Sequence, residues 1–350
     1  KRWDINIDDS AGIPITETPV LVFWRLIGKM VEDGLAPISF LAAMKHPLAR
    51  GGMSAGAFKR NTRLLEQLIL RGPRPGIGID GLIQALKMSM GEDRESIGAS
   101  VVTAKEKKDV HDWIIDLSAP IREFEKLIRS PSVKVQEIFE KHNQLFAKLV
   151  SDDSENSSWN AYSADYREQI ASIFSNIFEM CHDVPEISGQ EYLPFLESLL
   201  SSATYRAPFG VHPSLSILGP LEGRLMHFDR VILAGLNEGS WPPEPQADPW
   251  MSRPMRSDIG LPLPEIRIGQ SAHDFVQLCG AKEVFLTRSK RINGTPTVVS
   301  RWLLRMSSLI ESLDYGGVLD EANANWISWQ NSLDTPNCTR RLSPPTPRPV

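Results

Sequence analysis

The residue types that most often carry chemistry do not fall into a catalytic or metal-binding pattern in this chain. The three cysteines, Cys181, Cys279 and Cys338, are far apart and odd in number, which argues against a disulfide framework and favours a reducing compartment. No Cys-x-x-Cys pair occurs, and His46 and His212 lack a second ligand at metal-binding spacing, so we expect both to be structural hydrogen-bonding residues. We expect no catalytic residue, no metal and no cofactor in this chain.

Two features bear on phosphate binding. The sequence lacks the loop pattern Gly-x-x-x-x-Gly-Lys-Ser/Thr, and we interpret the glycine-rich segment 71–81 as a turn because it has no lysine. Between residues 250 and 305, however, nine lysines and arginines stand against four acids, a net charge of +5 in a chain of net charge −5. Such a segment suits contact with nucleic-acid phosphates, although a charged run is more often a solvated surface.

Size and composition favour a globular protein of two domains. The chain has 350 residues, of which 41% are hydrophobic and 23% charged. It has no apolar run long enough for a membrane span and no signal-peptide core near Lys1, so we expect a cytoplasmic protein without membrane contact. The first residue is not Met and the last ten are proline-rich, which predicts a piece of a longer protein.

Residues 35–205 are expected to be almost entirely helical, because apolar residues recur there at helical spacing. Ser188 followed by Glu191 predicts a capping box before the last helix. An earlier helix is expected to begin at Thr18 and Pro19 and to end at Gly34. The expected helical segments of the block are 38–46, 57–72, 101–117, 135–150, 159–183 and 190–203.

The pattern changes after residue 205. Two short apolar runs, 228–236 and 283–288, are typical of buried parallel strands, and a helix over 271–281 lies between them. A proline-rich loop is expected over 241–265, and a further helix over 297–312 should begin near Ser300 or Thr297. Strand, helix and strand in this order predict an α/β fold with a parallel sheet.

The simplest architecture is a discontinuous α/β domain with a large all-helical domain inserted into it. The α/β domain would comprise residues 1–34, including a strand near 3–8, and residues 206–315. Residues 35–205 would form the insert, and residues 316–350 a helix and a proline-rich linker. Two sequential domains are the alternative, and the sequence barely separates the two architectures, because no segment near residue 35 has the composition of a flexible linker.

A series of sequence blocks resembles the AddB subunit of bacterial AddAB helicase–nucleases, in its alphaproteobacterial form. The blocks run from Asp8 to about Arg305 in the order of that family, and they include DDSAGIPITETP, KHPLARGG, GLNEGSWP, DPWMSRPMR, GLPLPEIRIG and PTVVSRWLLR. The resemblance implies the second RecA-like domain of an inactivated superfamily I helicase, with a nuclease domain after the proline-rich linker. It also implies DNA ends and an AddA-type helicase–nuclease subunit as partners.

Motif positions of active superfamily I helicases are degenerate here. The turn that reads Lys-Gly-Leu-Glu in those enzymes keeps Glu222 but has Pro220 at the lysine position. The motif that supplies an arginine to the ATP phosphates has Cys279 in place of threonine and Gly280 in place of the arginine. Because charge develops on the transferred phosphoryl group, a glycine at this position predicts that ATP hydrolysis is lost.

Three residues follow the first expected strand, at the end where α/β domains place ligands. The resemblance implies that Asn237 and Glu238 lie where active relatives couple nucleotide to DNA, and we expect them to keep only a capping or packing role. Trp241 is a candidate to stack on bases of single-stranded DNA. The alternative for Trp241 is that it closes the strand end and fixes the loop.

Five arginines are candidate phosphate contacts. Arg253, Arg256 and Arg267 lie in or beside the proline-rich loop, where ion pairing with nearby acids is the alternative. Arg301 and Arg305 share one face of a helix, which suits a phosphate-binding edge or a subunit contact. Arg301 and Arg305 extend the basic segment into the helix expected over 297–312.

The sequence therefore predicts a non-catalytic, helicase-like fragment of a DNA-repair exonuclease subunit. It would guide DNA and hold the motor subunit while a double-strand break is processed for homologous recombination. One alternative is an active ATP-dependent helicase domain, which would need an arginine that reaches the nucleotide. The other is a protein–protein scaffold without DNA contact.

Overall fold

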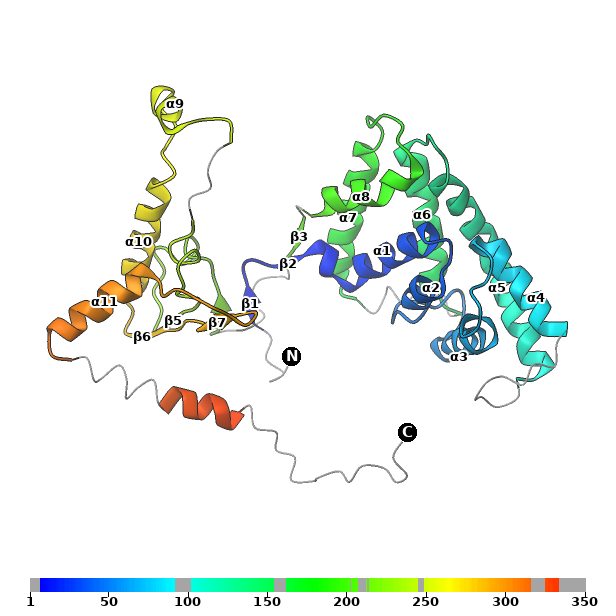
Figure 1. Cartoon of the computed structure of the whole chain (residues 1–350), viewed down its shortest axis with the longest axis horizontal. Helices are drawn as coiled ribbons and strands as arrows, with labels where there is room; N and C mark the ends of the chain where they lie inside the picture. The colour runs from blue at the N-terminus through cyan, green and yellow to red at the C-terminus, as the bar shows by residue number, and fades with distance from the viewer. Residues whose placement is uncertain are drawn as a thin grey trace. The chain divides into compact units, whose positions relative to one another are not determined.

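The computed structural model describes residues 7–91, 102–153, 162–201, 203–206, 212, 214–244, 249–315 and 325–333. They form a mixed, mostly helical protein with small parallel and antiparallel sheets (Figure 1). The chain divides into two compact units, Lys1–Ile217 and Leu218–Val350, called here the helical unit and the α/β unit. Most of the strand expected at 3–8 and the proline-rich linker lie outside the described residues, and the expected domain bounds stay a prediction.

The helical unit confirms the expected series of helices. Its α-helices are α1 (Pro19–Glu32), α2 (Pro37–Met44), α3 (Ala55–Leu65), α4 (Gly78–Gly91), α5 (Ala104–Ile128), α6 (Val135–Val150), α7 (Ala164–Met180) and α8 (Tyr192–Leu200). Among the described residues the unit also has three short turns of helix: η1 (Ile15–Glu17), η2 (Glu66–Leu70) and η4 (Gly189–Glu191). Helix α4 is a correction, because the expected turn 71–81 becomes helical at Gly78. In the described part of the chain, no helix combines the length and apolar composition needed to cross a bilayer.

Local signals account for where these helices begin and end. Pro19 occupies the first turn of α1, where its missing N–H costs nothing, and Gly34 follows the helix with a positive φ of 62°. Thr18 is the N-cap, but its hydroxyl donates to the Ile15 carbonyl at 2.6 Å instead of accepting from the helix. The capping box expected at Ser188 is confirmed, and it precedes α8.

Two small sheets join the start and the end of the helical unit. Strand β1 (Asp8–Asp9) pairs in parallel with β4 (Ser216–Ile217), and β2 (Ile13–Pro14) pairs antiparallel with β3 (Thr204–Tyr205). These pairs bring together segments that are far apart in the sequence. They close the unit on the side where α1 begins.

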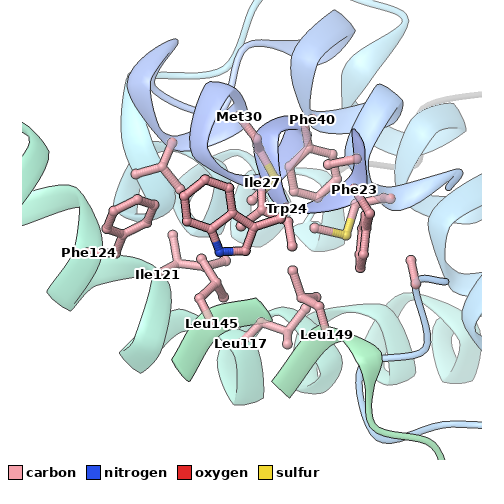
Figure 2. Packing of buried hydrophobic residues seen from close by; sticks show 14 of the residues in the cluster. Phe23, Trp24, Ile27, Met30, Phe40, Leu117, Ile121, Phe124, Leu145 and Leu149 are labelled. Atoms are coloured by element: carbon pink, nitrogen blue, oxygen red, sulfur yellow. The ribbon is translucent and has the colours of Figure 1, made fainter. Parts of the chain in front are cut away.

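Helix α1 lies at the centre of the helical core. Its side chains Phe23, Trp24, Ile27 and Met30 are fully or almost fully buried, and they pack among residues of α2, α5 and α6 (Figure 2). A helix with this much apolar surface must be covered on several sides, and neighbouring helices cover it here. The residues 19–32 therefore stabilise the helical unit directly.

A buried histidine sits against α1. The His142 ring stacks between Trp24 and Phe124, with centroid distances of 3.8 and 4.7 Å. Its Nε2 lies 2.9 Å from the Trp24 carbonyl oxygen, so Nε2 carries the hydrogen, and Nδ1 accepts from the Tyr192 hydroxyl at 3.1 Å. Burial lowers the pKa of His142 from 6.5 to about 3, which keeps the ring neutral in the folded protein.

The α/β unit contains the two expected strands and the helices expected over 271–281 and 297–312. Strand β5 (Arg230–Leu233) pairs in parallel with β6 (Glu283–Leu286), and α10 (Ile266–Leu278) connects them. The hairpin β7 (Arg291–Ile292) and β8 (Thr295–Pro296) precedes α11 (Arg301–Ser312), for which Ser300 is the N-cap. The expected loop 241–265 contains a short helix, α9 (Arg253–Asp258), and a further helix covers 325–333.

The two faces of the β5–β6 sheet differ. Val231 and Leu233 face a small core built with α10, whereas Ile232 on the opposite face is 61% exposed. The expectation that these strands are buried is therefore wrong for one face, because the described sheet has two strands and its outer face is covered only in part. On that face the Trp326 ring contacts Phe285 at a centroid distance of 5.1 Å.

The environment of His142 predicts that acid destabilises the helical unit. Above pH 6.5 the histidine is neutral in both states; as the pH falls towards 3, the unfolded chain takes up a proton that the folded chain excludes. We expect the free energy of unfolding to drop by roughly 1–2 kcal/mol between pH 7 and 5 from this residue. Denaturant unfolding at several pH values measures it.

His142→Gln should flatten this pH dependence, because glutamine cannot be protonated. The matched control is His182→Gln, at a side chain that is 76% exposed, and it should leave the slope as it is. Equal slopes for the wild type and His142→Gln would contradict the assignment.

Candidate functional site

The loop after β5 is held in place by backbone hydrogen bonds from two sides. The Leu236 amide donates to the Thr287 carbonyl just beyond β6 at 3.0 Å, and the Glu238 amide donates to the Val298 carbonyl at 3.0 Å. The Ser300 amide donates back to the Leu236 carbonyl at 3.1 Å. The carboxyl ends of β5 and β6 and the beginning of α11 therefore meet at one place, where α/β sheets usually bind ligands.

Four of the sequence-predicted residues meet there, namely Asn237, Glu238, Trp241 and Arg301, and with Ser300 they form what we call the strand-end cluster. The Glu238 carboxylate pairs with the Arg301 guanidinium, with Oε1 2.9 Å from Nε, and Oε2 accepts the Arg301 backbone N–H at 3.2 Å. Glu238 thus caps α11 and neutralises its first cation. The Arg301 guanidinium lowers the pKa of Glu238 below its usual range, so the carboxylate is ionised at neutral pH.

Trp241 and Asn237 turn inward from the same loop. The Trp241 ring contacts Phe275 of α10 edge to face, with centroids 6.2 Å apart, and belongs to the small core of the α/β unit. The Ser300 hydroxyl donates to the Trp241 carbonyl, which ties the loop to the N-cap of α11. Asn237 is 4% exposed, and its Oδ1 has no hydrogen-bond partner among the described residues. The packing of Trp241 accounts for the shape of the loop.

The residues expected to correspond to the first helicase motif form a turn against α10. Arg224 donates to both carboxylate oxygens of Asp274, at 2.6 and 3.0 Å, and the Asp274 side chain is 8% exposed. Within the turn, the Glu222 carboxylate accepts the Gly219 amide at 2.8 Å, while Pro220 is exposed. The retained Glu222 therefore closes its own turn, and Arg224 anchors that turn to the helix.

The second degenerate motif lies at the end of the same helix. Cys279 caps α10 at its carboxyl end and is partly buried, and burial raises the pKa of its thiol, which disfavours the reactive thiolate. Gly280 follows as an exposed residue. A Cβ added at Gly223 would lie 3.2 Å from a Leu278 methyl group, so the two degenerate motifs are neighbours. Both contribute backbone and packing to this region.

The arginines of the proline-rich loop are engaged within that loop. Arg253 forms an ion pair with Glu265, and the Arg256 guanidinium donates to the Pro262 carbonyl at 3.3 and 3.4 Å. Figure 1 shows α9, which carries both arginines, standing away from β5 and β6. The loop is braced by these contacts, and the structure does not bring these two arginines to the strand-end cluster.

Arg267 and Arg305 differ from the arginines of the braced loop. Arg267 lies in the first turn of α10 and Arg305 one turn after Arg301 on α11, and both are exposed. In the described part of the chain neither side chain forms an ion pair. They are the two predicted phosphate contacts that are available without breaking a contact of the fold.

One basic feature was missed by the sequence analysis. Asn293 and Gly294 have positive φ values of 49° and 81°, which is the conformation of the two-residue turn that closes the β7–β8 hairpin. Lys290 and Arg291 are both exposed: Arg291 begins β7, and Lys290 directly precedes it. The Asn-Gly pair was the available signal, because this dipeptide favours such turns strongly.

The chain also contains a sequence pattern that is typical of hydrolases. Residues 52–56 match the Gly-x-Ser-x-Gly pattern of hydrolase nucleophile elbows. Ser54 is the N-cap of α3, its hydroxyl accepts the Ala57 amide at 3.4 Å, and turns rather than a strand precede it. The serine therefore has a capping role. His46 and His212 have the structural role expected, since each ring accepts a backbone amide two residues on.

Comparisons with known proteins give no family assignment. No family model matches the chain, and no curated protein matches it. Among the described residues, no group of three or more histidine, cysteine and acidic side chains is placed to hold a metal ion. The site must therefore be judged on its own geometry.

We expect the Arg224–Asp274 pair to stabilise α10 more than the exposed Arg230–Glu283 pair does. Asp274→Asn removes the charge and one of the two acceptor oxygens of a largely buried bidentate pair, whereas Glu283→Gln breaks the Arg230–Glu283 pair, whose side chains are 62% and 48% exposed. We expect the first variant to increase amide hydrogen exchange in α10 by at least about twofold more than the second. Equal exchange in both variants would show that the stability of α10 does not depend on the Arg224–Asp274 pair.

Proposed function

We propose that this chain is a non-catalytic, helicase-like part of an AddB-type subunit of a DNA double-strand-break repair helicase–nuclease. In this proposal β5, β6, α10 and α11 belong to an inactivated second RecA-like domain that is discontinuous in sequence. The order of the sequence blocks supports it, as do two parallel strands joined through α10. The protein would act in the cytoplasm, beside an AddA-type motor subunit, on DNA ends that are resected for homologous recombination.

The observation that carries the proposal is the residue at position 280. Gly280 stands directly between α10 and the segment that leads into β6, at the place where the resemblance puts the arginine for ATP. A guanidinium at that place would meet the charge that develops during phosphoryl transfer.

Electrostatics support a DNA-guiding role over a purely structural one. The exposed cations Arg267, Lys290, Arg291 and Arg305 come from the segment that carries the net positive charge, although the whole chain is acidic. Cations without an acidic partner release counterions when they meet phosphates, which is the main source of sequence-independent affinity for DNA. A scaffold without DNA contact is the principal alternative, and a working ATPase is the other.

Single-stranded DNA binding over a range of salt concentrations tests the guiding role. The protein should bind a mixed-sequence oligonucleotide at low salt, with an affinity that falls as salt rises. We expect the double replacement of Arg267 and Arg305 by Gln to make the slope of log binding constant against log salt concentration shallower. The slope should change by about 0.7 for each phosphate that the protein no longer neutralises. Fluorescence anisotropy measures both.

Arg253→Gln is the matched control, because Arg253 is exposed but paired with Glu265. It should change the salt dependence less than the double replacement does. Absence of binding at low salt would favour the scaffold, and hydrolysis of ATP by the purified protein would favour the active helicase.

A further inference from the structure

A row of three aromatic rings lies on the outer face of the β5–β6 sheet. The Trp326 ring contacts Phe285 of β6 at a centroid distance of 5.1 Å, and on its other side it contacts the Trp329 ring at 5.2 Å. Both tryptophans belong to the helix over 325–333, which is drawn in red in Figure 1. We call Phe285, Trp326 and Trp329 the aromatic platform.

The two tryptophans of the platform are open to solvent. Trp326 is 49% exposed and Trp329 is 60% exposed, although tryptophan is among the residues that proteins bury most on average. Every residue of the helix 325–333 is exposed. Helices shorter than about 12 residues are only marginally stable in water unless another surface packs against them. A ligand that covers the two rings would therefore bury apolar surface and stabilise the helix.

The charges beneath the platform are balanced within the sheet. The Arg230 guanidinium lies 5.5 Å from the centroid of the Phe285 ring and forms an ion pair with Glu283. The strand register places Arg230 opposite Glu283 on the face that carries Phe285. The helix 325–333 contains no charged residue. The acid on this face is therefore matched by a cation, and the helix adds none that would repel a polyanion.

Beyond the platform the chain is basic. Between Val284 and Ile310 the sequence contains five lysines and arginines and no acid. Lys290 and Arg291 follow Phe285 by five and six residues, and both are exposed. In the described part of the chain neither of their side chains forms an ion pair. Aromatic rings followed by exposed cations suit a ligand that combines flat rings with a negatively charged backbone, as single-stranded nucleic acid does.

We propose that the aromatic platform stacks bases of single-stranded DNA on Trp326 and Trp329, while phosphates of the same strand are bound by Lys290 and Arg291. Every base has a π face, so the platform holds a strand without reading its sequence. The inference rests on the proposed DNA-guiding function, and it names where the bases are held. The alternative occupant is an apolar groove of a partner protein, which would need the tryptophans but not the cations.

The test is Trp329→Leu in the full chain. Leucine is apolar and forms helices well, so the helix is kept and the π face is lost. The variant should bind a fluorescein-labelled, mixed-sequence single-stranded oligonucleotide roughly fivefold or more weakly. The slope of log binding constant against log salt concentration should stay as in the wild type, because stacking releases no counterions. Trp329→Phe keeps an aromatic ring and should retain most of the affinity.

Two controls separate stacking from other causes of weaker binding. Trp250→Leu makes the same change at another tryptophan of the α/β unit, which is 86% exposed and lies in the proline-rich loop, and it should leave the affinity unchanged. An abasic oligonucleotide of the same length keeps the phosphates and lacks the bases, so the wild type and Trp329→Leu should bind it equally. A loss as large with the abasic chain as with the normal one would overturn the stacking role.

The cations are tested through the salt dependence. Replacement of Lys290 and Arg291 together by Gln should make the slope shallower by about 0.7 for each phosphate no longer neutralised. It should leave the effect of Trp329→Leu in place, because stacking and phosphate binding use different groups. An unchanged slope would remove the two cations from the site. Circular dichroism checks that each variant is folded.

The outcomes distinguish this inference from the function on which it rests. Salt-dependent binding by the wild type, with no loss in either Trp326→Leu or Trp329→Leu, overturns the platform and leaves the DNA-guiding role standing. The platform is also overturned if these variants bind DNA normally but lose association with a partner protein. Absence of binding by the wild type at low salt overturns both the platform and the guiding role.

Discussion

The strand-end cluster depends on a short set of backbone hydrogen bonds that hold the loop after β5 between the exit of β6 and the start of α11. The Leu236 backbone N–H donates to the Thr287 carbonyl, and the Leu236 carbonyl accepts the Ser300 N–H. One residue therefore joins the loop to the exit of β6 and to the start of α11. Because the bonds use main-chain atoms, they do not depend on which side chains the bonded residues carry, and the packing of Trp241 adds to them. Glu238 can therefore meet Arg301 without any contribution from the degenerate motif positions at Pro220 and Gly280.

The distribution of ion pairs explains which cations of the α/β unit are available to a ligand. Three acids within the basic segment are paired: Glu265 with Arg253, Asp274 with Arg224, and Glu283 with Arg230. These pairs hold the proline-rich loop, the turn before β5 and the strand pair. The net positive charge of the basic segment is therefore presented to solvent by exposed cations on α10, the β7–β8 hairpin and α11. A count of charges along the sequence does not distinguish these from the paired arginines.

Sequence reasoning located most elements because their signals are local. Periodicity, the proline at position 19 and the Ser188 capping box specify helices through neighbours within a few residues, and the two apolar runs specify strands. The ion pairs it missed join distant segments: Arg224 reaches Asp274 over 50 residues, and Glu238 reaches Arg301 over 63. The exposure of Ile232 was missed for a related reason, since burial of a strand depends on the elements beside it.

The two units differ in how much apolar surface they bury, and this difference bears on where a ligand can act. The helical unit has a continuous core around Trp24 and Phe124, whereas the core of the α/β unit has only Leu233, Leu236 and Phe275 as buried members in the described residues. Local opening is easiest where few apolar contacts must be broken. The loop after β5 thus lies in the unit where small rearrangements break the fewest apolar contacts, while the helical unit supplies the heavily packed part of the chain.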